Sequence, residues 1–225
     1  LEYRAGHMAA ATRLFQQAEV QASTTEPAAR AKALMGLGSV ALRDGRAEQA
    51  EHYYSQALDA AARIETGGDV GLLGNAYNGR GVARAQLGQL DAAASDLGQA
   101  RMTMRRTGDT VSAAMVGSNL GRIEGLRNHW SQAVQEFDAA IEVFRRYQVF
   151  DYMAATLASK AMAELNMVQP AAAAATIERS VPLLPRLEDA RLVAVLRGAQ
   201  VEVALAIGQL EQAEQALRAL PVSGT

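Results

Sequence analysis

Alanine recurs along the chain at an almost constant interval, and apolar residues follow each alanine at helical spacing. The interval is 39 to 43 residues. A large apolar residue stands four positions after each alanine, and a third position follows three residues later, which is the pattern of one helix face. The first two positions are Ala11–Phe15, Ala50–Tyr54, Ala93–Leu97, Ala133–Phe137, Ala173–Ile177 and Ala213–Leu217. The third positions are, in the same order, Ala18, Ala57, Ala100, Ala140, Ser180 and Leu220. Each group predicts a helix with a buried face.

A turn position precedes each alanine by five residues, and a second amphipathic stretch precedes the turn. In the unit that contains residues 31–61, the first stretch of apolar and small residues at helical spacing ends shortly before Gly45. A left-handed helix cap favours glycine at such a position. The turn positions are Gly6, Gly45, Gly88, Asn128, Val168 and Gly208. Each unit is therefore predicted to be helix–turn–helix, with small residues such as Gly38 and Ala50 where its two helices cross.

Self-similarity at a period of roughly 20–50 residues is typical of repeat architectures. We expect one repeat domain over residues 1–225, with about five and a half helical hairpins. The units are 1–23 (partial), 27–65, 70–106, 110–148, 151–182 and 186–220. Regularity should be weakest at 181–185, because Pro182 and Pro185 must end a helix.

The repeat resembles the tetratricopeptide repeat family. The family pattern W-x₂-L-G-x₂-Y, then A-x₃-F, corresponds to Leu34-x₂-Leu37-Gly38-x₂-Ala41 followed by Ala50-x₃-Tyr54. The period is about 40 residues and not the family's usual 34 or so, which lengthens each helix by nearly one turn. The resemblance implies an all-α, right-handed α-α superhelix whose first helices line a concave groove.

Composition narrows the function classes. Hydrophobic residues make up 49%, aromatic residues 5%, and the formal net charge is −2. Nucleic-acid binding would require a basic footprint, so none is expected. Cysteine is absent, which excludes disulfides and thiol chemistry, and no run of about 18 apolar residues predicts a membrane helix. We expect a cytoplasmic protein.

No motif predicts catalysis, a metal or a cofactor. The glycine-rich stretches 36–38 and 67–71 lack the preceding strand of a phosphate-binding loop, so helix packing and a linker explain them better. His7, His52 and His129 lie in separate units without ligand spacing. We expect no enzyme activity.

The implied groove carries polar side chains that fit a protein or peptide partner. The candidate partner-binding residues are Lys32, Arg43, Asn75, Asn78, Gln86, Asn119, Arg122 and Asn166. Asparagine can grip a peptide backbone with one donor and one acceptor. Related long-period proteins use an asparagine ladder in this way, but only Asn119 matches that pattern, since Gly36, Gly79 and Ser159 stand at its equivalents. The alternative is ordinary solvated surface.

Three functions stay open at this point. The chain can be the interaction module of a larger bacterial regulator, a small-ligand or short-peptide sensor, or a self-assembly module that pairs through exposed repeat ends. The chain begins with Leu1, so we expect it to be a piece of a longer protein. His7-Met8 resembles a cloning scar, whereas the repeat register of Gly6 and Ala11 favours native sequence.

Overall fold

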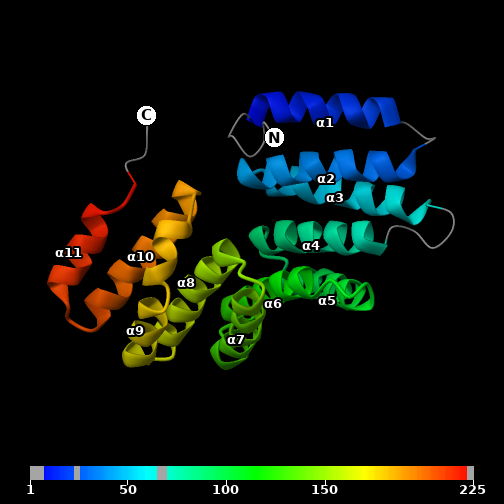
Figure 1. Ribbon diagram of the computed structural model, residues 1–225. Helices are drawn as coiled ribbons and strands as arrows, with labels where there is room; N and C mark the ends of the chain where they lie inside the picture. Colours follow the sequence, from blue (N-terminus) through cyan, green and yellow to red (C-terminus); the bar gives the residue numbers. More distant parts are fainter. Residues whose placement is uncertain (1–7, 23–25, 65–69, 222–225) are drawn as a thin grey trace. The chain divides into compact units, whose positions relative to one another are not determined.

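The computed structural model describes residues 8–22, 26–64 and 70–221, and every element in these ranges is a helix (Figure 1). The all-α class is thus confirmed. The elements are α1 (Met8–Ala22), α2 (Pro27–Arg43), α3 (Ala47–Ala62), α4 (Val70–Gln86), α5 (Leu90–Arg106), α6 (Thr110–Leu126), α7 (Trp130–Arg146), α8 (Phe150–Asn166), α9 (Pro170–Glu178), the short 3₁₀ helix η1 (Val181–Arg186), α10 (Ala190–Ala206) and α11 (Leu210–Arg218). None of these described helices is long and apolar enough to cross a membrane.

The chain divides into two compact parts, one ending at Val116 and one beginning at Gly117, and each is described by itself. In the first part each helix contacts the next from α1 to α5, and α2 also contacts α4. In the second part α8 contacts α7, α9 and α10, and α10 contacts α9 and α11. First helices of successive hairpins therefore touch within each part, which is the neighbour relation of a helical repeat stack.

One turn geometry joins seven pairs of consecutive helices in the described chain. The middle residue of each three-residue turn is left-handed, with φ between 57° and 76°, at Gly45, Gly88, Gly108, Asn128, Gln148, Val168 and Gly208. The next residue donates its N–H to the carbonyl five positions back, as Gln209 does to Ala204 at 2.8 Å. This is a Schellman cap, which satisfies the last carbonyls of the helix. Two 17-residue helices and two such turns make up the 40-residue period.

The predicted turn positions are confirmed wherever the structure describes them, while Gly6 lies outside the described residues. Proline begins α2 and α9, at Pro27 and Pro170, where a missing N–H costs little. The predicted irregularity is also present, because α9 ends at Glu178 and η1 follows.

The six alanines of the repeat are all buried, between 0% and 5% exposed. Two expected core positions are wrong: Ala18 on α1 is exposed and Leu217 on α11 is 57% exposed. In the described chain α1 packs mainly on α2, and α11 mainly on α10. A helix with one neighbour buries a narrower stripe than a helix between two, so positions at the edge of the stripe are exposed.

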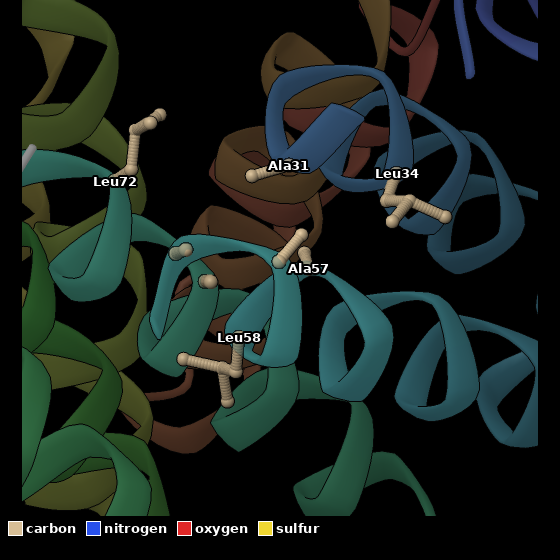
Figure 2. Packing of buried hydrophobic residues seen from close by; sticks show 8 residues of the cluster. Ala31, Leu34, Ala57, Leu58 and Leu72 are labelled. Carbon is tan, nitrogen blue, oxygen red and sulfur yellow. The ribbon is translucent and has the colours of Figure 1, made fainter. Parts of the chain in front are cut away.

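Glycine on the first helices makes room for large side chains of the second helices. The Tyr54 ring of α3 lies against Gly38 of α2 and Gly79 of α4, where an added Cβ would overlap it. Gly121 of α6 takes the Phe137 ring in the same way, at 2.6 Å from a built Cβ. Beside this crossing, α2, α3 and α4 share an apolar cluster that includes Leu34, Leu58 and Leu72 (Figure 2). Small residues thus let the helices approach closely, and large side chains fill the space between them.

Replacing Gly79 by alanine should destabilise the fold by about 1–3 kcal/mol, because the new methyl group collides with the Tyr54 ring. Gly98 in α5 is the matched control, since nothing lies within 4 Å of its built Cβ. Gly98→Ala should stabilise by about 0.5–1 kcal/mol through helix propensity. Urea denaturation measures both, and changes of the same sign would contradict the packing.

Val168 is a β-branched residue in a left-handed conformation, with φ of 58° and 85% of its surface exposed. Val168→Gly should relieve backbone strain while losing little contact, for a net gain of about 0.5–1 kcal/mol. The reverse change at the equivalent turn, Gly208→Val, should destabilise. A lower denaturation midpoint for Val168→Gly, or a higher one for Gly208→Val, would show that valine adopts this turn without backbone strain.

Candidate functional site

Two neighbouring first helices of the first part present polar side chains at matched positions. Lys32 of α2 and Asn75 of α4 stand at the same distance before their turn glycines, and so do Arg43 and Gln86. All four are exposed. Asn78 lies one turn after Asn75 on α4 and is half-buried. We call these five residues the α2–α4 face.

The α2–α4 face is rich in hydrogen-bond donors. The ammonium of Lys32 and the guanidinium of Arg43 attract carboxylates, and the arginine fork can hold one with two parallel bonds. The amides of Asn75, Asn78 and Gln86 offer both donors and acceptors, which suits a peptide backbone. Asn78 and Arg43 already take part in contacts within the protein, so a partner would add to or exchange those contacts.

Two serines on first helices form hydroxyl–hydroxyl contacts with a neighbouring helix. The Ser39 hydroxyl donates to the Met35 carbonyl at 2.9 Å and also lies 2.9 Å from the Tyr54 hydroxyl. In the second part the Ser118 hydroxyl lies 2.9 Å from that of Thr156, which joins α6 to α8. These serines fix the helices that carry the candidate residues.

The second part holds the remaining candidates on its own first helices. Arg122 of α6 is exposed, and Asn119 is half-buried and engaged within the protein. Asn166 is exposed, but its amide donates to the Met162 carbonyl of its own helix at 2.8 Å. Asn166 is therefore already partly satisfied.

The missing asparagines of the ladder have a physical reason. Gly36 and Gly79 stand where the ladder would have asparagine, and an added Cβ at either would meet the ring of Phe15 or Tyr54. Aromatic rings of the preceding second helix thus fill the space that those side chains would need.

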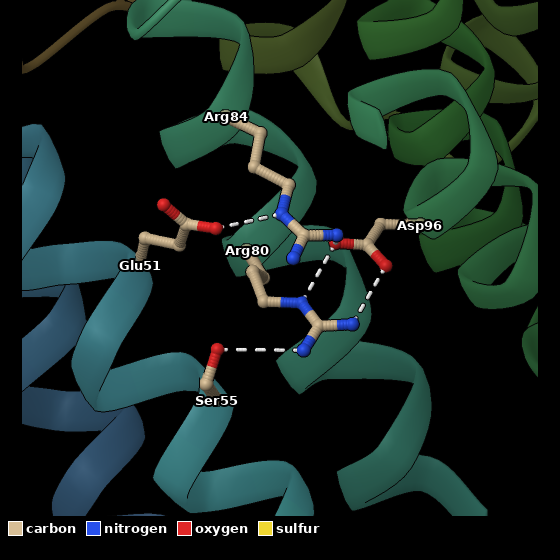
Figure 3. Close-up of polar contacts among 5 residues, drawn as sticks. All are labelled: Glu51, Ser55, Arg80, Arg84 and Asp96. Atoms are coloured by element: carbon tan, nitrogen blue, oxygen red, sulfur yellow. Dashed lines mark hydrogen bonds and ion pairs between the residues drawn. The ribbon is translucent and has the colours of Figure 1, made fainter. Parts of the chain in front are cut away.

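A charged network clamps α4 between α3 and α5 (Figure 3). Arg80 donates two bonds to Asp96, from Nε at 2.8 Å and from Nη2 at 2.9 Å, and contacts the Ser55 hydroxyl at 3.4 Å. Arg84 donates from Nη1 to Asp96 and from Nε to Glu51, both at 2.9 Å. One carboxylate therefore accepts three bonds from two arginines.

Burial makes this network a strong constraint. Asp96 is 4% exposed. Its hydrogen bonds raise the pKa of Arg80 above the ordinary value, against the lowering effect of burial, so Arg80 stays charged. A buried charge of this kind is stable only while its partners are present. The network thereby holds α4, and with it Asn75, Asn78 and Gln86, in place.

A smaller network occupies the equivalent place in the second part. The Lys160 ammonium on α8 donates to Asp138 on α7 at 2.6 Å and lies 3.5 Å from Glu164. Lys160 and Glu164 are buried, and the second carboxylate oxygen of Glu164 has no hydrogen-bond partner among the described residues.

The repeat register contained a signal for both networks. Arg80 and Lys160 stand at the position that Leu37 takes in its unit, which is the core leucine of the family pattern. One turn later stand Arg84 and Glu164. Charged residues at core positions require buried partners, so they could have been singled out before the structure was known.

The histidines do not form a site within the described chain. His129 Nδ1 lies 2.8 Å from Glu124 in its own hairpin, and His52 is exposed. His7 lies outside the described residues. No group of three metal-ligating side chains comes together in the ranges that the structure describes.

Asp96→Ala should destabilise the fold by about 3–5 kcal/mol, because two half-buried arginines lose their shared carboxylate. Glu142→Ala is the control, since it breaks the exposed Glu142–Arg145 pair and should hardly move the urea midpoint. Equal effects of the two changes would show that the network adds nothing to stability.

Known proteins share this architecture. A family model described as tetratricopeptide repeat matches residues 29–106, which run from α2 to the end of α5. No curated protein matches the sequence significantly. Among solved structures, BtubC from P. vanneervenii is 20% identical with a TM-score of 0.74, and the match covers 94% of this chain and 87% of that chain.

Two further structures extend the likeness. A Rap conjugation gene regulator of the plasmid pLS20, solved in complex with a peptide, is 14% identical with a TM-score of 0.77, and the match covers 96% of this chain and 59% of that chain. A thermophilic TPR protein of Thermus thermophilus is 17% identical with a TM-score of 0.60, covering 86% of this chain and 93% of that chain. At such identities the likeness concerns the fold. Residues 29–106 therefore match the tetratricopeptide repeat family, and the described chain has a tetratricopeptide-like helical repeat fold.

Proposed function

We propose that this chain is a binding scaffold and not an enzyme, and that the α2–α4 face holds a peptide segment of a partner protein. The observation that carries the proposal is the matched pairing of exposed Lys32 with Asn75, and of Arg43 with Gln86, on two first helices in contact. Such a surface offers repeated polar contacts along an extended chain, as repeat proteins commonly do.

Rigidity favours this use of the face. The Tyr54 ring fills the space between Gly38 and Gly79, and the Arg80–Asp96 pair ties α4 to α5. A preorganised surface loses little conformational entropy when a partner binds, so modest contacts suffice for useful affinity.

The charge of the α2–α4 face indicates the kind of peptide. Lys32 and Arg43 are its only ionic groups, and both are cations. A peptide with acidic residues spaced to reach both would gain steering and charge-assisted hydrogen bonds. Asn119, Arg122 and Asn166 remain candidates for further contacts on the first helices of the second part.

The solved structures support the same direction. The Rap regulator of similar fold was solved with a peptide bound. We propose by analogy that this chain is the cytoplasmic interaction module of a larger bacterial regulator, formed by one continuous set of repeats.

Selection of random 12-residue peptides on the immobilised chain tests the proposal. Enriched peptides should be acidic, and the double change Lys32→Glu and Arg43→Glu should weaken their binding about tenfold or more in fluorescence polarisation. The control is Arg105→Glu with Arg106→Glu, an exposed pair at the end of α5. Equal loss in both double variants, or loss in neither, would remove the α2–α4 face as the binding surface.

A further inference from the structure

Three charged residues fill one recurring place in the first part. Glu51 follows the repeat alanine of α3, Asp96 stands three residues after that of α5, and Arg84 stands four residues before the turn at Gly88. Their side chains meet in the slot that α4 forms with the second helices on either side of it (Figure 3). We call this place the inter-helix slot.

In the last slot of the second part, all three positions are alanine. Ala174 follows Ala173, Ala216 stands three residues after Ala213, and Ala204 stands four residues before Gly208. All three line a cavity of about 370 Å³ between α9, α10 and α11. The loss of three long side chains accounts for the space.

The cavity keeps cationic and amide groups. Arg197 and Gln200 of α10 both line it, and Arg197 Nη1 donates to the Gln200 side-chain oxygen at 2.9 Å. Gln200 is 8% exposed and stands at the position of Arg80 and Lys160. The Nε group of Arg197 is buried without a hydrogen-bond acceptor in the described chain.

An anionic group lines the same cavity without neutralising the arginine. Glu178 of α9 is a lining residue, yet within the described residues Arg197 forms no ion pair with it or with any other carboxylate. The guanidinium of an arginine is a planar fork of donors that matches a carboxylate. Opposite charges held apart in one cavity match a molecule that carries both.

We propose that this cavity binds a small zwitterion, a free amino acid or a dipeptide. Its carboxylate accepts a hydrogen bond from the Arg197 guanidinium, and its ammonium group faces Glu178. The volume lies in the lower part of the roughly 300–1,000 Å³ range of ligand pockets, which suits a ligand of this size. The site is distinct from the α2–α4 face and does not depend on it.

Isothermal titration calorimetry on the full chain tests this site with alanyl-glutamine, alanyl-leucine, glutamine and leucine as probes. At least one should bind with a Kd below about 1 mM. Its methyl ester lacks the carboxylate and its N-acetyl derivative lacks the ammonium, so each should bind about tenfold more weakly.

Two variants assign the binding to the cavity. Arg197→Gln should weaken the bound probe about tenfold or more, while Arg191→Gln, an exposed arginine on the same helix, should leave its Kd unchanged. Ala216→Asp should supply an internal carboxylate at the Asp96 position and abolish binding. Circular dichroism verifies that each variant is folded. If one is not, Glu178→Gln takes its place and should weaken binding of the probe about tenfold.

The proposal is overturned if no probe binds, if the esters bind as well as the parent compounds, or if the folded pocket variants bind normally. Full binding by the N-acetyl derivative would also overturn it, since a plain carboxylate site would then explain the data. Arg197→Gln should leave peptide binding at the α2–α4 face unaltered, which separates failure of one proposal from failure of the other.

Discussion

The close crossing between a small residue on one helix and a large ring on the next underlies this structure. Gly38 and Gly79 approach the Tyr54 ring from two first helices, and Ala50 is fully buried one turn before it. Because interiors are packed to crystal density, this contact tolerates neither a larger glycine replacement nor a smaller ring without cost. It fixes the distance between first helices, and therefore the spacing of the polar side chains on the α2–α4 face.

The same crossing creates the inter-helix slots, because a first helix held close to two second helices encloses the side chains between them. What occupies a slot is then free to differ from hairpin to hairpin. Arg80 and Asp96 fill one with paired charge, Lys160 and Asp138 part of another, and alanines leave the slot beside Arg197 open. Repeat proteins permit this variation since each unit contacts only its neighbours.

Periodicity made the helices, the turns and the buried alanines predictable, because all of them follow from local residue types at a constant spacing. The left-handed cap at Val168 was predictable in position, although valine itself disfavours it. The exposure of Lys32, Arg43, Asn75 and Gln86 followed from the register as well. The charged network did not, since one sequence names the charges but leaves open which buried partner lies across the slot from Asp96. The cavity was harder still to foresee, because alanine is common throughout this chain.

Alanine has two opposite roles here, and the distinction depends on what faces it. At Ala50 or Ala93 a helix or ring approaches closely, so the missing side chain is replaced by protein and the site is full. At Ala204 and Ala216 no side chain reaches into the slot as Arg84 and Asp96 do in the first part, and a space remains beside them. An apolar wall alone would leave that space without specificity. The Arg197 guanidinium, which lines the space, gives it a preference for a carboxylate. A single repeat geometry can thus provide a rigid polar face on two neighbouring hairpins and a ligand-sized cavity in another.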